Sequence, residues 1–470
     1  MYGKIKDMRI AFIPIDNRPV CYSLAKDIAS LDDAIEFFIP PREYLGDLKK
    51  VAGYDEILSW LNSCQQVDAI ILSLDTIAHG GLVSSRRSLD TFDEIKNRVE
   101  KLKKILLEKN AKVYAFSSIM RISNNNYNEE EKEYWAQYGK KIFEYSYNST
   151  YLPYNQLTSQ PSPIREGAGI PQEIIEDYLA TRKRNFEINK LYLEWQKEGI
   201  FDTLIFSKDD CAEFGFNVEE ARELENLGGK TKTGADEIPL TLLARAIEKD
   251  VKIFVEFTEP DCKNLISNYE DVSIEKSVFG QLELGGFSLA QNKDDADLIL
   301  VVNNFREKQG ELVMGWETGG KYRGALVAPN KSYCIADVRY ANGADNDFVA
   351  ELLPQIDLDK FYGYAGWNTS ANTLGSLLAG VKVRFNAKKY NEEAFKKLQL
   401  IRFLDDWAYQ ANVRGQIERP CDISNLMKPY EEKLIEVLGI NTRLSQQLSF
   451  LEREYLFPWN RKFEVEVVIK

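Results

Sequence analysis

Short apolar segments recur along the chain, and each is closed by a polar or glycine-rich stretch. Most of them are followed by a segment with helical periodicity. Continuous apolar runs of this length suit strands that are buried on both faces, which is typical of a parallel sheet covered by helices. The nine expected strands are residues 10–16, 35–40, 69–75, 112–119, 203–210, 252–257, 298–304, 333–339 and 362–368.

This pattern predicts an α/β protein. Nine strands are one more than a closed (β/α)8 barrel needs. We therefore expect a (β/α)8-like barrel or a parallel-sheet core with a C-terminal helical cap. An open, doubly wound, multi-domain α/β arrangement is the alternative.

The remaining pattern predicts how the chain is organised. Residues 129–147 and 171–199 are expected helices, and the stretch between them is rich in Pro, Gly and Ser. A long polar loop inside a compact domain is more often a functional lid than a linker. We predict an α/β catalytic domain at 1–387 with a lid-like insertion around 121–200. Residues 388–470 should form a helical C-terminal region that ends in a short strand.

Composition excludes several classes of function. The net charge of −13 and the pI near 5.0 argue against nucleic acid and against anionic membranes, because both need a basic face. No run of about 18 apolar residues is present, so we expect no membrane span. The first residues lead straight into a strand pattern without a visible signal peptide, so the expected location is cytoplasmic.

Cysteine and histidine usage narrows the chemistry further. The six cysteines are scattered without paired spacing, and we expect reduced, mostly buried thiols. His79 is the single histidine, which excludes most zinc and triad hydrolases. Proton transfer is left to Asp, Glu, Tyr, Lys or Cys. We expect neither a cofactor nor a metal.

Polar side chains close the predicted strands. In parallel α/β folds the loops after the carboxyl ends of strands form the ligand site, so these groups should converge on one pocket. The competing interpretation is that polar residues end strands everywhere, because Asp and Asn favour turns. Seven endings of this kind favour a shared site: Asp16-Asn17-Arg18, Asp75, Arg121, Lys208-Asp209-Asp210, Asn303-Asn304, Asp337 and Asn368.

Asp209 and Asp210 are the strongest catalytic candidates. Two adjacent carboxylates in an apolar environment cannot both ionise freely, so one pKa rises and a proton stays available near neutral pH. Alternatively, Asp210 caps a helix that begins near Ala212 and Asp209 is solvated.

Other motifs supply candidate binding groups. Asp236 and Glu237 precede a predicted helix and could bind a ligand or only complement the helix dipole. The glycines before Arg86 would let backbone N–H groups approach a polar ligand. Trp367, Asn368 and Asn372 combine an aromatic face with amides, which suits a sugar. For residues 402–414, RFLDDWAYQANVR, a solvated helix face with i, i+4 ion pairs is favoured.

Together the motifs IPIDNRP, DTIAHGGLVSSR, FSKDD, TGADE, YAGWNTSANTLG and RFLDDWAYQANVR resemble the bacterial domain of unknown function 4127 family over nearly the whole chain. The glycine-rich motif of that family more often reads Tyr-Gly-Gly-Leu, so His79 is a departure that argues against its catalytic use. A weaker similarity of site connects TLIFSKDD and GWNTSAN with N-acetylhexosaminidases that use substrate assistance. There an acidic pair after the fourth barrel strand polarises the acetamido group and protonates the leaving oxygen.

Three functional hypotheses follow. The first is a glycoside hydrolase for N-acetylated amino sugars, with Asp210 as general acid/base and Asp209 orienting the acetamido group. The second is a Mg²⁺- or Mn²⁺-dependent hydrolase or transferase with aspartate ligands. The third is a non-catalytic carbohydrate-binding protein. The expected partner is a small carbohydrate, and its candidate binding residues are Asp16, Arg18, Asp75, Arg86, Arg121, Lys208, Asp236, Glu237, Asn303, Asp337, Trp367, Asn368 and Asn372.

Overall fold

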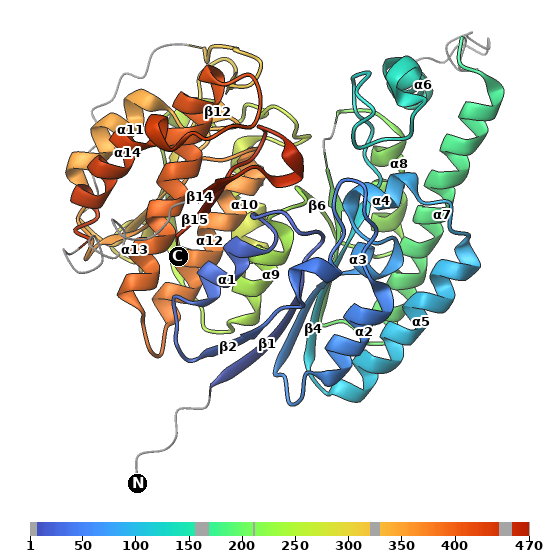
Figure 1. Cartoon of the computed structure of the whole chain (residues 1–470), viewed down its shortest axis with the longest axis horizontal. Coiled ribbons are helices and arrows are strands. Elements are labelled where there is room, and N and C mark those ends of the chain that lie inside the picture. Colours follow the sequence, from blue (N-terminus) through green and yellow to red (C-terminus); the bar gives the residue numbers. More distant parts are fainter. Residues whose placement is uncertain (1–6, 156–168, 210–211, 320–329, 441–453, 470) are drawn as a thin grey trace.

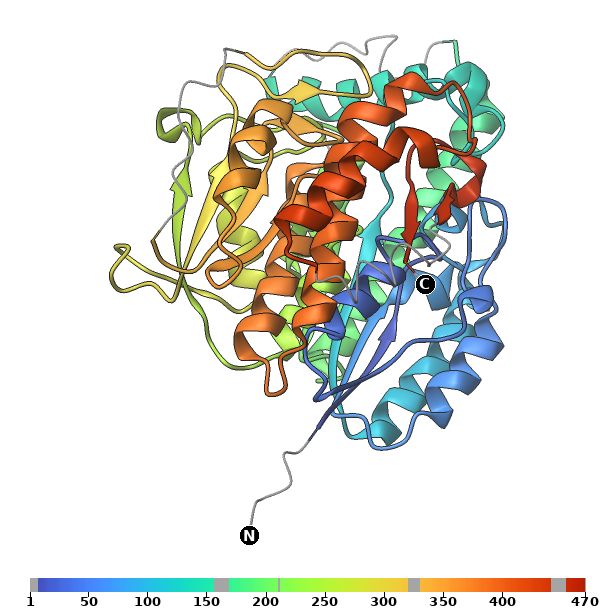
Figure 2. The ribbon, with the colours of Figure 1, turned by 60° about the vertical axis from the view of Figure 1, so that its left-hand side comes forward.

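The computed structural model describes residues 7–155, 169–209, 212–319, 330–440 and 454–469. Two α/β units, each built on its own parallel sheet, lie side by side (Figure 1). The view in Figure 2 shows the C-terminal helices packed over the second unit.

The first sheet has six parallel strands in the order β2-β1-β3-β4-β5-β6. Its central strands β3 and β4 are buried along almost their whole length, as their apolar sequences require. The strands are β1 (Met8–Ile13), β2 (Ile35–Phe38), β3 (Ala69–Ser73), β4 (Lys112–Ile119), β5 (Thr203–Lys208) and β6 (Thr231–Thr233).

The second sheet has five parallel strands in the order β13-β11-β9-β7-β8. In both sheets the second strand lies on one side of the first, and the chain then crosses to the other side. Such a reversal of strand order opens a crevice at the carboxyl ends of the strands. The strands are β7 (Lys252–Phe257), β8 (Ser288–Leu289), β9 (Leu298–Asn303), β11 (Tyr333–Asp337) and β13 (Phe361–Ala365).

All nine predicted strands are confirmed, and the fold is α/β with parallel-sheet cores. The pairings within the described residues divide the strands between two sheets and close neither, so a (β/α)8 barrel is not shown. The strands β6 and β8 were not predicted, because segments of three and two residues are too short to form an apolar run.

Helices cover both faces of the first sheet, and most of them belong to the first unit. A core of buried residues fills the space between one sheet face and α2, α3, α5, α7 and α8. Figure 1 shows these helices on the side away from the second unit. The helices are α1 (Ser23–Ala29), α2 (Tyr54–Ser63), α3 (Leu74–Ala78), α4 (Leu82–Arg87), α5 (Phe92–Lys109), α6 (Trp135–Asn155), α7 (Gln172–Lys197) and α8 (Phe216–Asn226).

A larger core joins the two units. Helix α9 packs on β3 and β4 of the first sheet and on α12, which in turn lies against β11 and β13 of the second. The apolar contact is therefore continuous from one sheet to the other. The helices of this part are α9 (Ile238–Ala246), α10 (Ile274–Leu284), α11 (Asn346–Leu352) and α12 (Ser370–Asn386).

The C-terminal region packs on the second unit as α13 (Glu392–Arg402), a π-helix (Phe403–Val413) and α14 (Ser424–Val437), with an antiparallel pair β14 (Glu454–Leu456) and β15 (Glu466–Val468). The predicted solvated face of residues 402–414 is wrong. The Arg402–Asp406 ion pair does form at 2.8 Å, but both side chains are buried. Asp406 also accepts the Gly366 backbone N–H, so this helix is tied to the interior.

The helices predicted at 129–147 and 171–199 correspond to α6 and α7. Helix α6 begins later than predicted. Within the proposed lid, residues 156–168 lie outside the described part of the chain. In the part that is described, no helix combines the length and the apolar character needed to cross a membrane.

Candidate functional site

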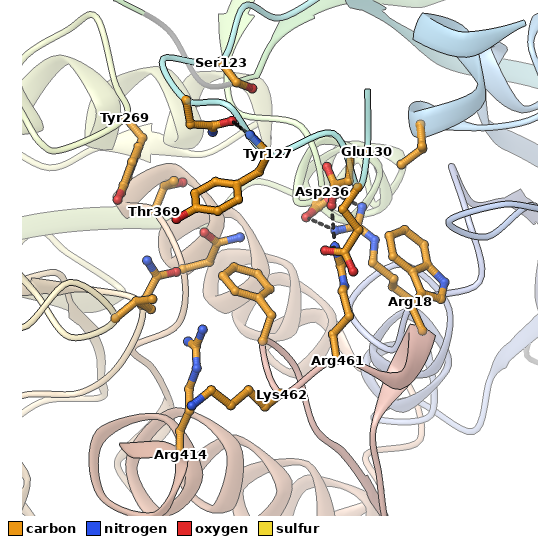
Figure 3. A pocket seen from close by; sticks show the side chains of 18 of the residues that line it. Arg18, Ser123, Tyr127, Glu130, Asp236, Tyr269, Thr369, Arg414, Arg461 and Lys462 are labelled. Atoms are coloured by element: carbon orange, nitrogen blue, oxygen red, sulfur yellow. Dashed lines mark hydrogen bonds and ion pairs between the residues drawn. The ribbon is translucent and has the colours of Figure 1, made fainter. Parts of the chain in front are cut away.

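A polar cleft of about 620 Å³ opens at the carboxyl ends of both sheets (Figure 3). The first unit contributes residues that follow β1, β3, β4, β5 and β6. The second unit contributes loops that follow β7, β9, β11 and β13, and the C-terminal segment 459–463 completes the wall. The strand order reverses in each sheet, and such a reversal opens a crevice at the carboxyl ends of the strands. The cleft therefore lies where parallel α/β folds place ligands.

Six predicted site residues line this cleft, namely Arg18, Arg121, Asp209, Asp236, Asn368 and Asn372. They come from both sheets, so the prediction of a shared pocket holds for this subset. Asn368 has a positive φ of 62°, which asparagine tolerates better than most residues. Asn372 lies in the first turn of α12, where its side-chain oxygen accepts the backbone N–H of Glu237 at 3.2 Å.

Arg18 is the centre of a buried ion-pair cluster. Its guanidinium donates to both carboxylate oxygens of Asp236, at 3.0 and 2.5 Å, and its Nε donates to Asp16 at 3.0 Å. The third carboxylate, Glu464, lies 3.5 Å from Nη1. One positive charge cannot neutralise three buried carboxylates. Burial raises the pKa of Glu464 to about 7, so this group holds a proton near neutral pH.

Asp209 belongs to a second charged network, on the side of β4 and β5. Its Oδ2 lies 3.4 Å from Arg121 Nη1 and 3.7 Å from Arg86 Nη2. Glu130 and Glu131 contact the same two arginines. Burial opposes ionisation of Glu130, but the arginines outweigh this effect and hold its pKa well below the usual range. Arg86 is buried behind the wall and does not itself line the cleft.

The second predicted catalytic residue, Asp210, lies outside the described residues. Its alternative role as a cap for a helix near Ala212 is wrong, because α8 begins at Phe216 with Gly215 at the N-cap position. The neighbouring Lys208 forms an ion pair with Asp271 and does not line the cleft.

Asp16, Asp75 and Glu237 are buried close to the carboxyl ends of the first sheet without lining the cleft. Asp75 accepts the Ser118 backbone N–H at 2.8 Å, and burial raises its pKa to about 7. Glu237 accepts from Gln281 Nε2 at 2.7 Å, and burial raises its pKa to about 8. Glu237 occupies the N-cap position of α9 but makes no side-chain capping bond.

In the second sheet, Asn303 and Asp337 form a buried polar cluster at the carboxyl ends of β9 and β11. Asp337 accepts hydrogen bonds from Asn303 Nδ2 at 2.9 Å, from the Asp345 backbone N–H at 2.8 Å and from the Tyr364 hydroxyl at 2.9 Å. Burial, together with the charge of Asp345, raises the pKa of Asp337 to about 7. Neither Asn303 nor Asp337 lines the cleft.

Trp367 and the glycine-rich turn after His79 do not play the ligand-binding parts predicted for them. Trp367 is 4% exposed and packs in the core shared by the two units, so its ring does not line the cleft. His79 is buried, and burial holds its pKa well below the usual range. Gly80, with a φ of 85°, brings the turn so close to Val51 that an added Cβ would lie 2.2 Å from that side chain. The glycine serves packing at this position.

Much of the cleft lining was not predicted from the sequence. The cleft also contains the amides of Asn125, Asn342 and Asn460, and the aromatic rings of Tyr127, Tyr269, Trp459 and Phe463. Charged residues missed were Glu129, Glu130, Glu311, Arg414, Glu418, Arg419, Arg461 and Lys462. The run Pro458-Trp459-Asn460-Arg461-Lys462 was the available signal, since it places an aromatic ring, an amide and two cations in one short turn.

The sequence also predicted that no metal is used. Within the described ranges, no group of three or more His, Cys, Asp or Glu side chains is arranged to hold a metal ion. The carboxylates of Asp209 and Asp236 form ion pairs with Arg121 and Arg18.

No curated protein and no solved structure matches this chain. The family described as "Protein of unknown function (DUF4127)" matches residues 10–468, and the chain therefore belongs to that family.

Proposed function

We propose that the cleft is the active site of a glycoside hydrolase, with N-acetylated amino sugars as the expected substrate class. The observation that carries the proposal is the composition of the wall: five asparagine amides and four aromatic residues accompany the carboxylates. Amides bond to hydroxyl and acetamido groups, and aromatic faces pack on the apolar faces of sugar rings.

Asp209 acts as the ionised carboxylate of the pair. Arg121 and Arg86 lie beside Oδ2, and they stabilise the negative charge. In this role Asp209 accepts the N–H of the substrate's acetamido group, whose carbonyl oxygen then attacks the anomeric carbon. Asp210 is the proposed general acid that protonates the leaving glycosidic oxygen, and later the base that activates water.

Asp236 is the alternative general acid. It lines the cleft, and burial raises its pKa, with the charges of Asp16 and Asp209 adding to the effect. However, Arg18 occupies both of its carboxylate oxygens. A bidentate contact of this kind favours the ionised form, so Asp210 is the first choice for the acid.

Aryl glycosides with good and poor leaving groups test the roles. Asp210→Asn should slow poor leaving groups by about 10²- to 10⁴-fold and largely spare an activated nitrophenyl glycoside. Asp209→Asn should slow both substrates alike, because the lost contact is with the acetamido group. Asp236→Asn should slow poor leaving groups and largely spare the activated glycoside only if Asp236 is the general acid.

Turnover of glycosides without an N-acetyl group, unaffected by Asp209→Asn, would contradict substrate assistance. Near-wild-type rates in all three variants on every active substrate would remove the catalytic assignment. The cytoplasmic location expected from the first residues of the sequence stays a prediction, which cell fractionation can test.

A further inference from the structure

The cations of the cleft fall into two groups. Arg18, Arg121 and Arg461 all form ion pairs with carboxylates. Arg18 contacts Asp16, Asp236 and Glu464, and Arg461 lies 2.6 Å from Glu130 and 3.5 Å from Glu129. Dashed contacts in Figure 3 mark this neutralised group around Arg18, Asp236, Glu130 and Arg461. These side chains have their charge balanced within the protein.

Arg414 belongs to the other group. It is 8% exposed and lines the cleft, yet among the described residues it has no carboxylate ion pair. Its Nη1 donates to Gln410 Oε1 at 3.0 Å, and its guanidinium lies 4.9 Å from the centre of the Phe463 ring. Burial lowers the pKa of Arg414, an effect that the surrounding acidic groups do not cancel. The cost of burying this charge is thus left partly unbalanced.

Lys462 and Arg419 extend the same group. Lys462 Nζ donates to the Ile417 carbonyl oxygen at 2.8 Å, a neutral partner, and no ion pair of Lys462 occurs within the described part of the chain. Arg419 is exposed and lines the cleft. Figure 3 shows Arg414 and Lys462 away from the dashed contacts.

The nearby carboxylate of Glu311 is already engaged. It accepts hydrogen bonds from Asn342 Nδ2 and from the Met314 backbone N–H. These bonds hold it between its own loop and the loop that follows β11. The guanidinium of Arg414 therefore keeps N–H groups that a ligand in the cleft can reach. A planar guanidinium is suited to bidentate binding of a carboxylate or phosphate.

We propose that the cleft has an anion subsite formed by Arg414 and Lys462, with Arg419 at its rim, and that its ligand is a sugar bearing a carboxylate or phosphate group. This inference rests on the proposed function only for the sugar part of the ligand. The Phe463 ring beside Arg414 supplies an apolar face next to the charge, which suits a sugar acid or a sugar phosphate.

Calorimetric titration of the full chain with glucose, glucuronate, glucose 6-phosphate and inorganic phosphate tests the subsite directly. At least one anionic sugar should bind about tenfold or more tightly than glucose, and added NaCl should weaken that binding. Whichever of the anions binds best identifies the source of the charge.

Arg414→Gln should remove most of this preference, and Lys462→Gln should remove part of it. Arg245→Gln is the matched control, because it removes a partly buried arginine whose partners are the Thr203 hydroxyl and backbone carbonyls outside the cleft. It should bind like the wild type. Circular dichroism of each variant separates lost binding from lost folding.

Equal binding of glucose and all three anions, binding of none of them, or an unchanged preference in folded Arg414→Gln would overturn the subsite. The result is independent of catalysis. Anion preference without turnover of any glycoside would keep the subsite and reject the hydrolase. Hydrolysis of glycosides without a preference for anionic sugars would keep the hydrolase and reject the subsite.

Discussion

The first five strands of each sheet follow the same order, but the two sheets use their polar strand ends differently. In the first sheet, Arg18, Arg121, Asp209 and Asp236 follow the strands and reach the cleft surface. In the second sheet, Asn303 and Asp337 are fully buried, and the cleft is lined by Asn368 after β13 and by the loops that follow β7, β9 and β11.

The difference shows that a polar residue at the end of a strand can either line a ligand cleft or hold the following loop in place. Asp337 binds the Asp345 backbone N–H and the Tyr364 hydroxyl, and so it fixes the chain that follows β11, which contributes Asn342 to the cleft. The Asp209 carboxylate contacts the guanidinium groups of Arg121, at the cleft wall, and of Arg86, behind it. We interpret the second cluster as scaffold and the first as the chemical part of the site.

Removing one carboxylate from each sheet should give the largest effect on stability and the sharpest contrast. Asp337→Ala leaves several buried donors unpaired, so we expect a loss of about 3 kcal/mol in the free energy of unfolding. Asp209→Ala should cost about 1 kcal/mol or less, because its carboxylate is partly exposed and Glu130 and Glu131 still neutralise the arginines. Urea unfolding followed by circular dichroism measures both, and equal losses would erase the distinction.

The pH dependence of stability gives a smaller effect. The pKa of Asp337 is raised to about 7 in the folded chain, above the value near 4 expected when unfolded. The folded state then binds more protons between these values, so stability falls as pH rises toward 7 and is constant above it. From pH 5.5 to 8 this group alone should account for about 2 kcal/mol.

Asp337→Asn cannot ionise, so its urea-unfolding stability should fall less steeply between pH 5.5 and 8 than that of the wild type. The slope is the readout, since the substitution can shift stability at every pH. Asp359→Asn is the control, because it removes an exposed carboxylate and should keep the wild-type slope. A variant at Asp337 with an unchanged slope would show that this carboxyl does not titrate differently on folding.

Chelation should give the smallest effect. In the first sheet, arginines already occupy the cleft carboxylates Asp209 and Asp236, so a cation would have to displace an existing ion pair. Exhaustive EDTA treatment should therefore leave the rate on any active glycoside unchanged. A loss of activity that is restored by adding Mg²⁺ or Mn²⁺, but not by returning the protein to metal-free buffer, would assign these aspartates as metal ligands.

The strands, and the end of each sheet at which the cleft lies, follow from the local pattern of apolar and polar residues. An unbroken apolar run such as residues 69–72 indicates burial on both faces, and this property is local. Parallel strands then place the residues after β1, β4 and β5 at one edge. Arg18, Arg121 and Asp209 could be predicted for that reason.

The division of the strands into two sheets, and the choice of polar residues that face the cleft, depend on packing between segments that are distant in the sequence. An apolar run does not specify its neighbouring strand, and a polar side chain turns inward or outward according to what packs over it. The contacts that settle this are distant in sequence: Arg18 meets Asp236 218 residues away, and Arg461 meets Glu130 331 residues away. Local pattern carries no signal for such pairs, so the polar run at 459–463 could not be placed beside the strand ends, whereas the strands themselves were found.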